Sequence, residues 1–130
     1  MRTQDQKRAQ HAYDVVGNLP QDDKAKFKTL VLKFPAMVLQ NGLLASLAFV
    51  QHKDKTTNQR VFQAYNEWLT QGATWINWSG IQGNTVVERL CHDQMTVQRY
   101  RHAAREALAY ATWLKRAAEA LLADVETNEN

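Results

Sequence analysis

The sequence predicts an all-α fold: a single compact bundle of five to six helices that ends in a long C-terminal helix. Apolar residues recur at intervals of three and four along most of the 130-residue chain, and no strand-like alternation competes with this spacing. Proline is scarce, with two residues, so few positions forbid a helix. We assign residues 1–125 to one helical domain and residues 126–130 to a frayed acidic tail.

The first helix is predicted over residues 4–16, with Thr3 as its N-cap. Its apolar face consists of Ala9, Ala12, Tyr13 and Val16. A second helix is predicted to start after Pro20, because Asp22 and Asp23 then lie in its first turn, where the helix dipole favours acids. Its buried stripe is expected to contain Phe27, Leu30, Val31 and Phe34.

Pro35 is expected to begin a new segment, since the residue before a proline resists the α conformation. Residues 35–53 are apolar nearly all round, which predicts the central and most buried helix of the bundle. Asn41 and Gly42 interrupt this segment and indicate a kink or a close backbone approach.

The second half of the chain predicts three further helices. Thr57 is expected to cap a helix over residues 58–70, which is followed by a loop with three glycines and with Trp75 and Trp78. A short helix is predicted over residues 85–91. The last helix is predicted to begin near Thr96 and to run to about Val125.

Charge is distributed unevenly along the chain. Residues 119–130 contain four acidic and no basic residues, so residues 1–118 carry a net charge of +7 although the whole chain carries +3. A basic body of this kind can attract polyanions. The longest apolar run, "LLASLAFV", is far too short for a membrane span, and the single cysteine, Cys91, suits a reducing compartment. We therefore expect a cytoplasmic protein with no membrane contact.

Catalytic and metal-binding patterns are missing from the sequence. Glu88, Cys91 and His92 come closest to a metal site, but a zinc site needs three or four ligands at recognisable spacing. No nucleophile elbow, Walker loop or dinucleotide fingerprint occurs. We expect no enzymatic activity, no metal and no cofactor.

The tryptophans allow two interpretations. Trp75 and Trp78 could stack on RNA bases, or they could pack within the bundle or against another subunit. The loop lacks basic residues, which favours packing or a protein contact. We therefore assign Trp75, Trp78 and Trp113 to a subunit interface.

The last helix carries an apolar seam, a cationic strip and an aromatic flank. An apolar seam with alternating spacings of three and four contains Val97, Tyr100, Ala104, Ala107, Ala111, Leu114, Ala118, Leu121 and Val125. At 100° per residue, four residues fall within a sector of about 60° well off this seam and form a largely cationic strip: Arg101, Arg105, Thr112 and Arg116. Lys115 lies between the strip and the seam. Trp113 lies nearly opposite the seam, beside Tyr110 and Ala117 on the far flank. The cations form either an ordinary solvated face or a row matched to phosphates, and this stretch alone favours neither.

The stretch "YRHAAREALAYATWLKRAA" resembles the C-terminal signature of the small subunit of type III-B CRISPR effector complexes, the Cmr small-subunit family. The matching residues are Tyr100, Arg101, Glu106, Ala107, Leu108, Trp113, Leu114, Lys115 and Arg116. Upstream, the matches are Arg8, Ala9, Pro35, Asn41, Gly42 and Leu43. The sequence departs from the family at Ala104, where threonine is usual, and at Ala117, where phenylalanine is common.

The resemblance implies a non-catalytic helical subunit. Copies of it would stack head to tail beside other subunits of the effector complex and would line the channel for guide and target RNA. We predict RNA-backbone contacts for Arg101, Arg105, Lys115 and Arg116, with Lys53 and Lys55 as further candidates. The alternative is a protein-only helical adaptor whose cations pair with acidic partner surfaces.

Overall fold

The computed structural model describes residues 1–52 and 56–127, and within these ranges it contains helices and no strand. The all-α prediction is therefore confirmed. The helices surround one cluster of buried apolar side chains. The candidate tail is described only at Glu126 and Thr127.

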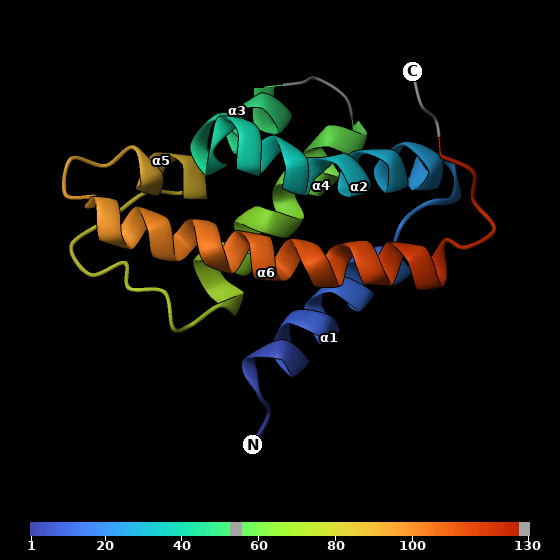
Figure 1. Cartoon of the computed structure of the whole chain (residues 1–130), viewed down its shortest axis with the longest axis horizontal. Helices are drawn as coiled ribbons and strands as arrows, with labels where there is room; N and C mark the ends of the chain where they lie inside the picture. Colours follow the sequence, from blue (N-terminus) through green and yellow to red (C-terminus); the bar gives the residue numbers. More distant parts are fainter. Residues whose placement is uncertain (53–55, 128–130) are drawn as a thin grey trace.

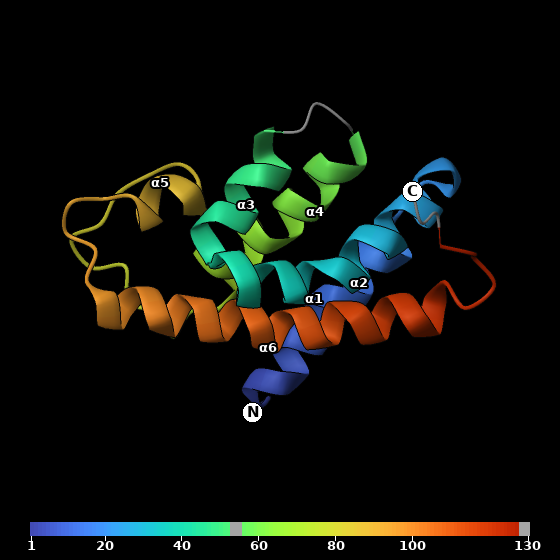
Figure 2. The same cartoon turned by 45° about the horizontal axis from the view of Figure 1, so that its top comes forward.

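The first and last helices form the main packing unit of the bundle. Helix α1 (Gln4–Gly17) crosses α6 (Val97–Leu121), and helix α2 (Lys24–Asn41) also packs against α6 (Figures 1 and 2). Thr3 caps α1 through a reciprocal capping box with Gln6, as predicted. Thr96 caps α6 by accepting a hydrogen bond from the amide of Arg99, which agrees with the predicted start of the last helix near this residue.

Helix α2 continues through Pro35, so the prediction of a new segment at this proline is wrong. A short 3₁₀ turn, Gln21–Asp23, precedes the helix. A proline inside a helix removes one backbone hydrogen bond and costs about 3 kcal/mol. Burial of Phe34 and Val38 on either side of it, in register with Phe27, offsets that cost.

The break at Gly42 is sharper than the predicted kink. Gly42 has a φ of 87°, a left-handed conformation that favours glycine, and it separates α2 from α3 (Leu43–His52). The two helices that it separates are not buried on all sides. Leu39 is 75% exposed and Phe49 is 47% exposed, whereas α6 packs against both α1 and α2. The apolar run therefore misidentified the central helix, which is α6.

The remaining elements close one side of the bundle. Helix α4 (Thr56–Glu67) begins before Thr57, the predicted cap, and passes into a π-helical turn, Trp68–Gly72. A β-carbon on Gly72 would lie 2.3 Å from the ring of Trp68, so only glycine allows this ring to fold against the turn. Helix α5 (Val86–Leu90) is capped by Thr85, which confirms the predicted short helix. Cys91, at its end, is exposed.

Candidate nucleic-acid interface

The candidate interface is the outer face of α6, directly opposite the face that this helix buries. Arg101, Arg105, Lys115 and Arg116, which we call the cationic strip, are all exposed. Among the residues that the structure describes, none of these four forms a hydrogen bond or an ion pair. The chain itself therefore leaves the four charges available to an external anion.

The buried face of α6 is wider than the predicted seam. Tyr110 and Ala117, which the helical angles put on a far flank, are fully buried, whereas Val97 and Leu121 at the ends of the seam are 65% and 49% exposed. Two helices pack on α6 from different sides, so its apolar contact exceeds a single coiled-coil stripe. The helix also ends at Leu121, four residues before the predicted end.

A buried carboxylate holds α6 in its orientation. Glu106 is only 3% exposed and accepts two hydrogen bonds of 2.7 Å from the guanidinium of Arg8 in α1. The indole N–H groups of Trp68 and Trp75 donate to the same carboxylate, at 3.0 and 2.7 Å. Four donors from three segments thus converge on one side chain, which we call the Glu106 cluster.

The balance of forces on Glu106 favours its ionised state. Burial alone raises the pKa of this carboxyl, but the hydrogen bonds from Arg8, Trp68 and Trp75 outweigh burial and leave the pKa below its ordinary value. The same pairing raises the pKa of Arg8. The cluster is therefore a charged pair inside the bundle, and the charge of Glu106 is unavailable to the cationic strip.

The three tryptophans assigned to a subunit interface all make contacts within the chain. Trp75 belongs to the Glu106 cluster, and Trp78 donates its indole N–H to the carbonyl of Leu69 at 3.0 Å. Trp113 donates to Asp5 of α1 at 3.0 Å. All three rings remain partly exposed. Their assignment to an interface with other subunits stays a prediction.

Arg116 differs from the other members of the cationic strip. Its guanidinium lies 5.1 Å from the ring centroid of Trp113, the distance of a cation–π contact. Hydrogen bonds from Trp113 and Arg8 lower the pKa of Asp5, and the nearby positive charge of Arg116 lowers the pKa of Asp5 a little further. The strip therefore has one end held against α1, while Arg101 and Arg105 project freely.

The other predicted features are only partly described. Lys53 and Lys55 lie outside the described residues. Across residues 1–52 and 56–127, no three His, Cys, Asp or Glu side chains come together as metal ligands. No helix in the same part of the chain is long and apolar enough to cross a bilayer.

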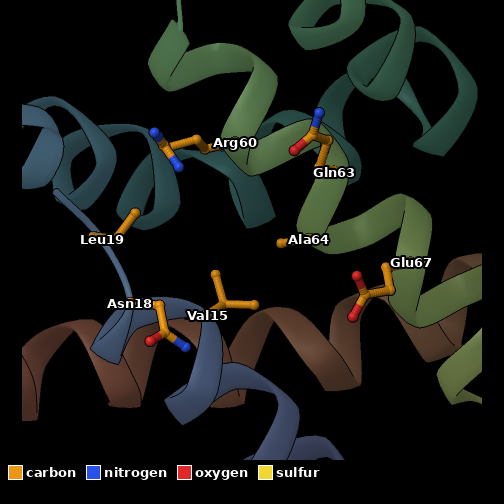
Figure 3. A pocket seen from close by; sticks show the side chains of 7 residues that line it. All are labelled: Val15, Asn18, Leu19, Arg60, Gln63, Ala64 and Glu67. Carbon is orange, nitrogen blue, oxygen red and sulfur yellow. The ribbon is translucent and has the colours of Figure 1, made fainter.

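A pocket of about 160 Å³ opens between the end of α1 and α4 (Figure 3). Both of its charged side chains are already paired: Arg60 with Asp23 at 2.7 Å, and Glu67 with His11 at 2.8 Å. Its floor is apolar, with Val15, Leu19 and Ala64. The residues that line it therefore offer no unpaired acid or base for catalysis.

Sequence reasoning missed the role of Glu106, although a signal was present. An acid in the middle of a strongly basic helix, next to the apolar seam, is a candidate for a buried partner. Its donors lie 31 to 98 residues away along the chain, so no local pattern identifies them.

Comparison with known proteins matches this architecture throughout. A family model described as CRISPR-associated protein (Cas_Cmr5) matches residues 4–121, from the first residue of α1 to the last residue of α6. The CRISPR system Cmr subunit Cmr5 of Thermus thermophilus is 29% identical over 123 residues, which cover 94% of this chain and 98% of that protein. A crystal structure of a CRISPR-associated Cmr5 family protein from Thermus thermophilus superposes with a TM-score of 0.66 at 28% identity, covering 94% and 99% of the two chains.

Proposed function

The chain belongs to the CRISPR-associated Cmr5 family of type III-B effector subunits, and from this premise we propose how it acts. It is a non-catalytic small subunit of a cytoplasmic ribonucleoprotein that serves antiviral defence. Copies of it stack in a short filament beside the other subunits. The cationic strip faces the phosphate backbone of guide or target RNA.

The observation that carries the RNA contact is the pair Arg101 and Arg105. They stand one helical turn apart, about 6 Å along the axis, and like charges at this spacing repel each other. Both are exposed and have no anionic partner among the described residues. A bound phosphate removes this repulsion and provides affinity without sequence selection, which suits a subunit that must accept any guide.

Reversing both charges provides the test. We expect Arg101→Glu combined with Arg105→Glu to weaken binding of a single-stranded RNA more than tenfold, because two attractive contacts become repulsive. Fluorescence anisotropy with a labelled RNA of about 20 nucleotides measures the affinity. Circular dichroism should show unchanged helix content, since neither side chain contacts the core.

Lys26→Glu combined with Lys33→Glu is the matched control, with the same change in net charge. Both lysines are exposed on α2. They lie roughly 140–160° around the helix axis from Lys28, whose ammonium reaches the end of α6. RNA affinity equal in the wild type and the arginine double variant would overturn the proposal. If that variant still captured the other subunits from its native host while RNA binding by the wild type was undetectable, the protein-only adaptor would be correct.

A further inference from the structure

A second pocket, distinct from the one in Figure 3, lies between α1 and the π-helical turn. Its volume is about 230 Å³, and its lining includes the side chains of Arg2, Lys7, Gln10, Asp14 and Trp68 and the backbone of Gly72. His11 also lines it, and the hydrogen bond from His11 to Glu67 separates it from its neighbour. We call it the α1 pocket.

The size of the α1 pocket suits one nucleobase. Its volume of about 230 Å³ exceeds that of a cavity of roughly 150 Å³ that holds benzene, so it has room for one ring system. At Gly72 the ring of Trp68 already fills the space that a side chain would occupy, so the turn itself closes this end of the pocket. Because the ring of Trp68 is buried against Tyr110 and presents no free face, a base would be held by its polar edge.

The chemistry of the walls is that of a nucleotide site. Arg2 and Lys7 make no ion pair with any described residue, and the ammonium of Lys7 lies 6.0 Å from the ring of Trp75. The Gln10 amide both donates and accepts hydrogen bonds, whereas the Asp14 carboxylate only accepts them. A plain anion site needs only cations. This pocket also has groups that can hydrogen-bond to the edge of a base, beside cations that can bind phosphate.

The position of the α1 pocket relates it to the cationic strip. Trp113 makes a cation–π contact with Arg116 and donates a hydrogen bond to Asp5 in the first turn of α1. Arg2 and Lys7 flank Asp5 in the sequence. Lys7, Gln10 and Asp14 lie roughly 140–180° around α1 from Asp5, so a strand bound at Arg116 would have to pass round the first turn of α1 to reach the pocket.

We infer that the α1 pocket receives one unstacked base of a single-stranded RNA, with the adjoining phosphate on Arg2 and Lys7 and the edge of the base on Gln10 and Asp14. This inference rests on the proposed function for the identity of the polymer. The pocket itself makes a separate prediction, because it should bind a free nucleotide even when the cationic strip is disabled.

Nuclear magnetic resonance of the indole N–H groups tests the inference in the full chain. Titration with each nucleoside 5′-monophosphate should shift the indole signals of Trp68 and Trp75 and leave those of Trp78 and Trp113 in place. Arg2→Glu combined with Lys7→Glu should lower nucleotide affinity at least tenfold, and Gln10→Ala should reduce the differences among the four bases. Arg101→Glu combined with Arg105→Glu should leave these shifts intact.

Two outcomes would overturn the inference. One is the absence of any nucleotide-induced shift at Trp68 and Trp75 in the wild type. The other is an equal response to inorganic phosphate, which would make this an anion site only. RNA binding that depends on Arg101 and Arg105 but not on Arg2 and Lys7 would contradict the pocket while leaving the proposed function standing. Nucleotide shifts in a wild-type chain that binds no RNA would support the pocket as a nucleotide site and contradict the proposed function.

Discussion

At the scale of single residues, Glu106 is the side chain on which most of the tertiary arrangement depends. It joins α1, the π-helical turn, the tryptophan loop and α6 through four hydrogen bonds. Removing one partner of a buried ion pair typically costs about 3–5 kcal/mol. Arg8 keeps a second ion pair, with Asp5 at 2.8 Å, so the loss of Glu106 belongs at the lower end of that range.

We expect Glu106→Gln to lower the free energy of unfolding by about 3 kcal/mol at neutral pH, measured by urea titration. The pKa of Glu106 lies below its ordinary value of 4.5 in the folded chain, so acid protonates the unfolded state first. The stabilisation is therefore complete above about pH 4.5 and is lost as the pH falls further.

Below pH 4.5 the variant should consequently lose less stability than the wild type. Glu119→Gln, at an exposed position of the same helix without an ion pair in the described chain, is the control and should behave as the wild type. Identical acid profiles for the wild type and Glu106→Gln would show that Glu106 does not stabilise the fold through its charge.

At the scale of elements, the junction between α2 and α3 depends on the backbone of one residue. The hydroxyl of Tyr100 in α6 accepts a hydrogen bond from the amide of Leu44, two residues after Gly42, so this turn is fixed to the central helix. The left-handed φ of Gly42 is what allows α3 to leave the line of α2.

We expect Gly42→Ala to destabilise the protein by about 1–2 kcal/mol, because an L side chain is strained in this conformation. Gly17→Ala is the matched control: the added β-carbon meets no atom within 4 Å, and the position lies inside α1. It should be neutral or stabilise by up to about 1 kcal/mol. Thermal unfolding of the two variants gives the comparison, and equal stabilities would refute the role of Gly42.

The elements also show how far the sequence can predict this structure. Local chemistry located the cap at Thr3 and the helix starts near Thr85 and Thr96, because a capping side chain bonds to amides only a few residues away. The predicted cap Thr57 instead lies inside α4. It failed at Pro35 and in choosing the central helix, because both outcomes depend on partners distant in the sequence. The cationic strip was predictable from helical geometry, whereas the α1 pocket needs α1 and the π-helical turn to meet.

At the scale of the whole molecule, the charge distribution governs the proposed association with RNA. Each neutralised phosphate of a single strand releases bound counterions, which gives a slope of about −0.7 in a log–log plot of affinity against salt. Two to four contacts from the cationic strip therefore predict a slope of about −1.4 to −2.8. Anisotropy titrations over a series of salt concentrations measure it, and a flat response would rule out phosphate contacts.

The pairing of α1 with α6 has a consequence for how the protein is made. Its key links, from Arg8 to Glu106 and from Asp5 to Trp113, span 98 and 108 residues, so the first helix leaves the ribosome long before its main partner exists. Until the last helix is translated, the apolar side of α1 stays uncovered and open to chaperones. The packing of α1 against α6 therefore takes place only after most of the chain has been translated. A nascent chain arrested before residue 97 cannot form the native core.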